Sequence, residues 1–309
     1  MPHWARHNEI ESKTRKMTAM IHFTDEDLFQ LDREFAELDI PIHARPFRAA
    51  ARILGGSFSI GPFYAGDDVN QICEAYRKLF PGCDFWPGAG KGLVASVDRV
   101  RTFTLPVVLG EYQIQVDSGL GFETPAEWSV WCRNDSEIGL RSAYAFADVY
   151  DLSTGADMLA RGTDSYDYLQ RARQHLADVA ASLSLSGAAS EAALQHIILI
   201  CELSLKAVLL HLGVTTKDLK DNFGHNIPKL ARELSRLSPH SDDEVMIRAC
   251  EAMPNLVASR YSTIGMTRLK IIQLALAGQF VAAAAVRRLG FEDLANQMGR
   301  TELRPPLEI

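Results

Sequence analysis

The chain has 309 residues, of which 47% are hydrophobic and 23% charged, and this balance is that of a soluble globular protein rather than a disordered one. Two domains are expected at this length. The formal net charge is −7, with 17 Lys and Arg against 16 Asp and Glu from Arg161 onward and 15 against 23 before it. A nonspecific nucleic-acid binder usually carries a basic surplus, so neither half has that composition.

Cysteine usage gives no sign of a disulfide framework or of a zinc site. The cysteines are odd in number, widely separated and never in a Cys-x-x-Cys pair. They are Cys73, Cys83, Cys132, Cys201 and Cys250. His3 and His7 lie four residues apart near the N-terminus, but two ligands do not make a metal site. We therefore expect no bound metal and no cofactor.

Two apolar stretches raise the question of membrane insertion. Residues 194–212 contain a glutamate and a lysine in mid-span, and residues 271–286 contain two glutamines. The second stretch is shorter than the roughly 20 residues that cross a bilayer. We expect both to be core helices. The first 23 residues contain no apolar core of signal-peptide length, so the protein is expected to be cytoplasmic and not bound to a membrane.

The first third of the chain predicts helices after a polar leader over residues 1–23. Thr24 precedes an apolar pattern of helical period whose first turn carries three acidic residues, as at a helix N-terminus. Similar patterns predict helices over residues 46–54 and from Asp67 to Phe80.

The period then changes to that of strands. Residues 93–116 are expected to form strands, with a hairpin turn at residues 109–111. The segment that contains Trp128 and Trp131 is predicted to be another strand, and a further apolar stretch runs from Tyr144 to Leu152. We therefore predict an α+β domain over residues 24–155, with an antiparallel sheet covered by helices.

The second half predicts helices throughout. Residues 151–164 have the Gly, Ser, Thr and Asp content of a domain boundary, and no strand pattern follows them. Asn226 and Pro228 are typical of a helix start, and Ser241 with Glu244 predicts a capping box. Helices are expected over residues 164–184, 188–212, 226–237, 241–253 and 266–289, with a short one in the tail over 291–309. This pattern predicts an all-α helical bundle over residues 160–290.

Three motifs in the second half occur in the order found in one known family. Their residues are Leu203, Leu205, Lys206 and Ala207, then Gly224, His225, Asn226 and Ile227, and finally Arg260 with Tyr261. Together they resemble the helical core of HEPN domains, whose pattern is a Leu-x-Leu-Lys-Ala helix, a Gly-His-Asp/Asn-Leu/Ile turn and a later Arg-Tyr. The resemblance covers about half of the chain and implies a HEPN-like bundle after the α+β domain.

The resemblance makes a specific demand on catalytic residues. HEPN ribonucleases carry an Arg-x4-6-His motif whose arginine and histidine face those of a second protomer and act without a metal. In the helical half, Arg171 and His175 have three residues between them, as have Arg236 and His240. The chain matches the spacing from Arg15 to His22, in the polar leader.

The resemblance therefore implies a non-catalytic binding or adaptor protein. Such a protein would dimerise through its helical domain and recognise RNA, a nucleotide or a protein partner. Its binding residues are expected to be Glu202, Lys206, His225, Asn226, Arg260 and Tyr261. The alternative is a metal-independent ribonuclease of a toxin or antiphage system, which would use Arg171, His175, Arg236 and His240 in spite of their shorter spacing.

Purely structural roles remain open for the same residues. His225 suits a turn in which its side chain bonds a helix end. Glu202 and Lys206, four residues apart on one helix face, suit an ion pair at the edge of the buried surface. Arg260 follows Pro254 and suits a bond to a helix C-terminus.

Overall fold

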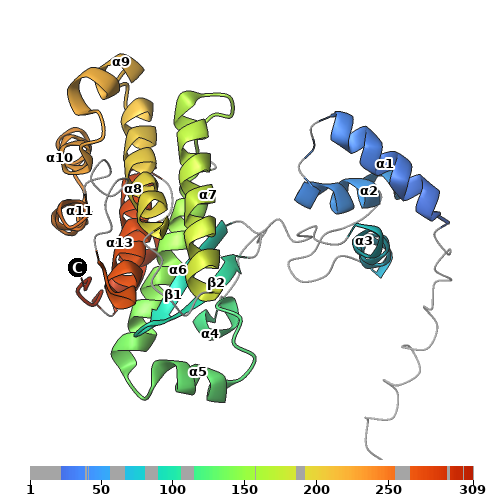
Figure 1. Cartoon of the computed structure of the whole chain (residues 1–309), viewed down its shortest axis with the longest axis horizontal. Coiled ribbons are helices and arrows are strands. Elements are labelled where there is room, and N and C mark those ends of the chain that lie inside the picture. Colours follow the sequence, from blue (N-terminus) through green and yellow to red (C-terminus); the bar gives the residue numbers. More distant parts are fainter. Residues whose placement is uncertain are drawn as a thin grey trace, which may run out of the picture. The chain divides into compact units, whose positions relative to one another are not determined.

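A computed structural model describes residues 22–38, 40, 42–55, 67–80, 90–105, 115–156, 158–185, 192–254, 265–290, 293–301 and 303–308. The described residues are mostly helical and contain one small antiparallel hairpin (Figure 1). The chain forms two compact units, Met1–Pro87 and Gly88–Ile309.

The described part of the first unit is helical, as its apolar patterns predict. Thr24 and Asp27 form a capping box, in which the Thr24 side chain accepts from the Asp27 N–H and the Asp27 carboxylate accepts from the Thr24 N–H. The core consists of side chains from three helices, among them Leu28, Phe35 and Tyr76. The elements are α1 (Asp25–Glu37), η1 (Ile42–Ala44), α2 (Arg45–Ile53) and α3 (Asp67–Leu79).

The second unit begins with a two-stranded hairpin, β1 (Gly90–Ser96) and β2 (Arg99–Leu105), paired from Gly90 opposite Leu105 to Ser96 opposite Arg99. The chain reverses at residues 97–98, whereas the predicted turn at 109–111 lies outside the described residues. Residues Val116–Gly119 form a short helix, so the strand predicted to reach Val116 is wrong at that residue.

The hairpin packs tightly onto the helices that follow it. A Cβ atom on Gly92 would lie 2.2 Å from Val149 Cγ2, so only glycine lets the strand approach this closely. The buried Gln279 side chain accepts from the Leu93 N–H at 3.0 Å and donates to the Leu93 carbonyl at 3.2 Å. The unit boundary therefore falls at residues 87 and 88, inside the region predicted as a single α+β domain over 24–155.

Two segments that follow the hairpin are helical, where strands or a domain boundary were expected. The strand predicted around Trp128 and Trp131 is wrong, because α5 (Pro125–Cys132) occupies this segment. The Thr124 hydroxyl accepts from the Glu127 N–H and Pro125 opens the helix, a start signal that outweighs the aromatic content. The stretch predicted as a boundary, 151–164, begins inside α6 (Ser136–Ala156).

The helices from residue 164 onward agree closely with their prediction, but the bundle also contains α6, which was expected in the α+β domain. Contacts join α6 to α7, α7 to α8, α8 to α13 and α13 to α6, and the hairpin packs on α6 and α7 (Figure 1). On the other side α10 packs on α8 and α11 on α13. The remaining bounds are α4 (Val116–Gly119), α7 (Asp164–Leu185), α8 (Ala192–His211), α9 (Thr216–Asp218), η2 (Leu219–Phe223), α10 (Ile227–Leu237), α11 (Asp243–Glu251), α13 (Arg268–Val286), η3 (Arg287–Leu289) and α14 (Leu294–Gly299).

One predicted helix start is wrong in detail. The expected capping box of Ser241 and Glu244 does not form, because α11 begins at Asp243 after Asp242, whose side chain makes no capping bond. The Asp243 carboxylate instead accepts from the His240 N–H at 2.9 Å.

Two helices, Ala192–His211 and Arg268–Leu289, are long and apolar enough to cross a membrane by length and composition alone. Within the unit, 67% and 78% of their most apolar windows are buried against other helices. This burial is consistent with core helices of a soluble protein.

Candidate functional site

The buried carboxylate of Glu202 contacts two other predicted site residues, Lys206 and His225. It lies on α8, where only 4% of its side chain is exposed, and it accepts from the Lys206 ammonium at 2.7 Å. His225 Nδ1 lies 3.0 Å from both Glu202 oxygens. The ion pair of Glu202 and Lys206 is thus present one helical turn apart, and His225 joins it from 23 residues further along the chain.

The turn that carries His225 is built by the residues around it. Gly224 has φ +55, a conformation that side-chain-bearing residues rarely adopt, and it lets the chain leave η2. The Asn226 side chain then caps α10 by accepting from the Lys229 N–H at 3.0 Å. Lys229 donates to the Asn222 carbonyl at 2.6 Å, and its ammonium lies 5.3 Å from the centre of the Phe223 ring. The predicted cap is confirmed.

Glu202 also fixes the orientation of an exposed imidazole. The His225 side chain is 63% exposed. Because Nδ1 faces a carboxylate, it carries the proton, and Nε2 is left to interact with other groups. This arrangement provides an oriented imidazole at the N-terminus of α10, with Lys206 and Lys229 nearby.

The ribonuclease alternative finds no site at Arg236 and His240. The His240 Nδ1 accepts from the Asp242 N–H at 3.2 Å, and Nε2 lies 3.2 Å from an Asp293 oxygen, so both ring nitrogens are engaged. Arg236 forms two bonds with Glu233 on the surface of α10. Arg236 and His240 thus bind different partners, and their side chains do not form a shared site.

The second pair lies on the surface of α7. Arg171 is exposed, and in the part of the chain that the structure describes it has no ion-pair partner. His175 lies one turn further on, with its Nδ1 3.0 Å from His196 Nδ1 on α8. Burial lowers the pKa of His175, and the neighbouring His196 lowers it further, whereas Asp178 acts in the opposite direction. Arg260 and Tyr261, the last predicted site residues, lie outside the described residues.

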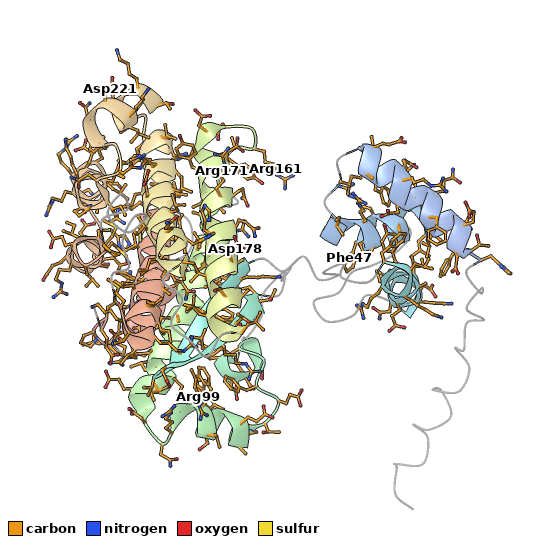
Figure 2. All side chains as sticks on the ribbon, in the orientation of Figure 1. Phe47, Arg99, Arg161, Arg171, Asp178 and Asp221 are labelled. Atoms are coloured by element: carbon orange, nitrogen blue, oxygen red, sulfur yellow. The ribbon has the colours of Figure 1, made fainter. Side chains whose placement is uncertain are left out.

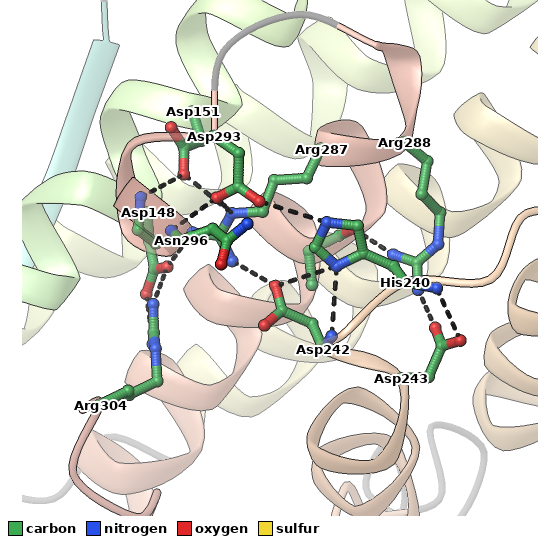
Figure 3. Close-up of polar contacts among 12 residues, drawn as sticks. Asp148, Asp151, His240, Asp242, Asp243, Arg287, Arg288, Asp293, Asn296 and Arg304 are labelled. Carbon is green, nitrogen blue, oxygen red and sulfur yellow. Dashed lines mark hydrogen bonds and ion pairs between the residues drawn. The ribbon is translucent and has the colours of Figure 1, made fainter. Parts of the chain in front are cut away.

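A buried ion network that sequence reasoning missed joins α6, the end of α13 and the segment between α10 and α11 (Figure 3). The fully buried Arg287 guanidinium lies 2.6 Å from Asp148, 2.8 Å from Asp151, 2.7 Å from Asp242 and 3.3 Å from Asp293. Burial opposes the charge of Arg287, yet the surrounding carboxylates outweigh this effect and raise its pKa. In the sequence, the sign of such a network is that Asp148 and Asp151, three residues apart, interrupt the apolar run of α6.

The network ties together distant elements of the chain. Asp151 accepts from the Leu294 N–H at 2.8 Å, which fixes the start of α14. Arg304 binds both oxygens of Asp148, and its guanidinium lies 4.6 Å and 4.7 Å from the ring centres of Tyr144 and Phe280. All of these contacts join parts of the bundle to one another.

A cavity of about 330 Å³ lies beside the network, between α6, α13 and residues 304–308. Most of its polar lining is paired: Arg141 binds Glu137 and Glu308, Gln273 donates to Glu308 at 3.1 Å, and Arg304 binds Asp148. The lining polar groups thus hold residues 304–308 against the bundle.

Asp151 gives the network a dependence on pH. Burial raises the pKa of Asp151 to about 6, although Arg287 and the Leu294 N–H favour its charged form. A carboxyl whose pKa is raised on folding contributes stability that is present below its unfolded pKa, about 4, and is lost as the pH rises through about 6.

We therefore expect the stability advantage of the wild type over Asp151→Asn to fall by on the order of 2 kcal/mol between pH 4 and pH 7. Urea denaturation of both proteins across this range measures the difference. A difference that stays constant, or that grows with pH, would mean that Asp151 is charged throughout.

Comparison of the chain with protein-family models, curated proteins and solved structures gives no match.

Proposed function

We propose that this protein is a non-catalytic, HEPN-like helical binding protein that recognises a phosphate-bearing ligand, an RNA strand or a nucleotide, at the start of α10. The observation that carries the proposal is the exposed His225 imidazole, oriented by the buried Glu202 carboxylate at a helix N-terminus. The N-terminus of a helix carries a partial positive charge, which favours phosphate, although here Asn226 already binds the Lys229 N–H.

The charges around this position support an anionic ligand. Lys206 and His225 both contact the Glu202 carboxylate. Lys229 lies in the first turn of α10. The Lys229 ammonium can form charge-assisted hydrogen bonds with phosphate oxygens, and His225 can do so through Nε2 when that nitrogen also carries a proton. The half-buried Phe223 ring beside Lys229 is a surface on which a base can stack.

We also propose that the protein acts as a homodimer through α8. Leu199, Leu203 and Leu210 recur at helical spacing on its half-buried face, which also carries His196 and Lys206. A second copy of the same face would cover these leucines. Light scattering of the purified chain tests this part, with Leu203→Glu expected to produce monomers.

Binding of a fluorescent single-stranded RNA of mixed sequence, and separately of ATP, tests the ligand. We expect His225→Ala to weaken binding by about 10-fold, because one charge-assisted hydrogen bond contributes on the order of 1.5 kcal/mol. His211→Ala, which removes an exposed histidine from the end of α8, is the matched control and should bind like the wild type. Affinity should fall as salt rises.

Two outcomes would contradict the proposal. One is that neither probe binds, or that His225→Ala binds as tightly as the wild type while circular dichroism shows both folded. The other is cleavage of the RNA without a metal, abolished by His175→Ala. That result would favour the ribonuclease alternative, which the exposed position of Arg171 one turn from His175 supports.

A further inference from the structure

Two histidines and an aspartate meet on the facing surfaces of α7 and α8. His175 and Asp178 are three residues apart on α7 and share one helix face, and His196 approaches them from α8. One ligand atom from each side chain lies within 4.8 Å of the other two. Figure 2 labels Asp178 on α7, together with Arg171, which lies seven residues earlier on the same helix.

The two imidazoles face each other through the same kind of atom. His175 Nδ1 and His196 Nδ1 are 3.0 Å apart, with the ring planes at 73°. If both nitrogens carry lone pairs, they repel one another at this distance, and if both carry protons, the hydrogens collide. The geometry therefore requires one shared proton or a cation bound by both nitrogens.

We propose that His175, His196 and Asp178 form a binding site for a divalent transition-metal ion such as Zn²⁺. Two nitrogen ligands at about 2.1 Å from one ion are about 3.0 to 3.4 Å apart at the angles of octahedral and tetrahedral sites, which matches the observed pair. The Asp178 oxygen, 4.0 Å from His196 Nδ1, needs only a small side-chain rotation to join them.

The chemistry of the ligand set agrees with this class of ion. Two imidazoles and one carboxylate suit Zn²⁺ and other first-row transition ions, whereas Mg²⁺ and Ca²⁺ prefer sets made of oxygen ligands. The His196 and Asp178 side chains are 43% and 46% exposed, so an ion can enter and keep water as a further ligand. All three residues lie on helices, which hold them rigidly.

The neighbouring residues also fit this assignment. The Gln174 amide donates to Asp178 Oδ1 at 2.9 Å, which leaves Oδ2, the oxygen nearer His196, for the ion. Such outer-shell bonds orient metal ligands. Arg171 is the cation one turn before His175, and its exposed side chain can extend into solvent. A bound ion would join α7 to α8 directly.

Titration of the metal-free full-length chain with Zn²⁺ by isothermal calorimetry tests the site. We carry the substitutions His3→Ala and His7→Ala in every protein, so that the other histidine pair does not contribute. One ion per chain is expected, with at least about 10-fold weaker binding for His196→Ala and for Asp178→Asn. His211→Ala is the matched control and should bind like its parent.

A second readout separates a lost ligand from a lost fold. Zn²⁺ should raise the Tm of the parent and of His211→Ala, but not of His196→Ala or of Asp178→Asn, which changes a half-exposed side chain without altering its shape. Co²⁺ should give visible absorption with the parent and with His211→Ala, but not with His196→Ala or Asp178→Asn. Absence of binding by the parent, or equal binding by His196→Ala, would overturn the proposal and leave a hydrogen bond between the two histidines.

Discussion

Replacing Arg287 with methionine is expected to lower the free energy of unfolding of the Gly88–Ile309 unit by about 3–5 kcal/mol. The guanidinium is fully buried and faces the carboxylates of Asp148, Asp151, Asp242 and Asp293. Methionine fills much of the same space but leaves several carboxylates close together without their cation. These groups must then take up protons or admit water, and either change costs stability.

Urea denaturation followed by tryptophan fluorescence measures this loss, and Arg232→Met provides the matched control. Arg232 pairs with Glu251, but both side chains are about half exposed. Its removal should change the stability by less than about 1 kcal/mol. If the two variants lost the same free energy of unfolding, the buried Arg287 network would stabilise the fold no more than an exposed ion pair does.

Replacing Glu202 with leucine should destabilise the same unit by about 2–3 kcal/mol. The reason is that the Lys206 ammonium, with only 13% of its side chain exposed, would lose its carboxylate partner. The His225 side chain is 63% exposed and can regain water, so we expect it to add little to this loss. Thermal and urea denaturation of the variant measure the change.

The double variant Glu202→Leu/Lys206→Met distinguishes a lost partner from poor packing. Removal of both charges leaves no unpaired ion, so most of the stability should return. The two substitutions would be additive if the leucine itself packed badly, and the proposed reason would then be incorrect. The double variant should regain stability and yet bind RNA more weakly than the wild type, because His225 has lost the group that orients it and the Lys206 charge is gone. This variant therefore separates the stability of the bundle from its proposed binding role.

Much of the fold follows from local features of the sequence. The bundle helices from residue 164 onward appear where the apolar period predicts them, whereas α6 lies in the region predicted as an α+β domain. The helix start at Thr24 and the cap at Asn226 form as expected, because both depend on residues within one turn. The helix at Pro125–Cys132 was missed because two tryptophans and a valine suggest a strand, while the Thr-Pro start signal that decides it is equally local.

Other features depend on contacts that no local pattern contains. Arg287 meets Asp151 across 136 residues and Arg304 meets Asp148 across 156 residues. The charges of Asp148 and Asp151 on an apolar helix indicate only that partners exist, without identifying them. The hairpin belongs to the second unit for the same reason, since its partner Gln279 lies 186 residues away from Leu93.

The candidate site was predictable in part. The helical spacing of Glu202 and Lys206 predicts their ion pair, and the cap at Asn226 places the neighbouring His225 at the start of a helix. The contact of His225 with Glu202 required the tertiary structure, because η2 and the turn at Gly224 set the distance between them. The meeting of His175 and His196 likewise depends on how α7 packs against α8.

The long sequence separation within the ion network has a consequence for synthesis on the ribosome. Asp148 and Asp151 leave the exit tunnel well before Arg287 and Arg304 are added. At a synthesis rate of roughly 5–20 residues per second, the two carboxyl groups have no cationic partner for several seconds or more. During this interval α6 can form as a helix but cannot bury its acidic face. The nascent second unit is therefore expected to need protection from aggregation until residue 304 has emerged, whereas α1 to α3 can pack with one another much earlier.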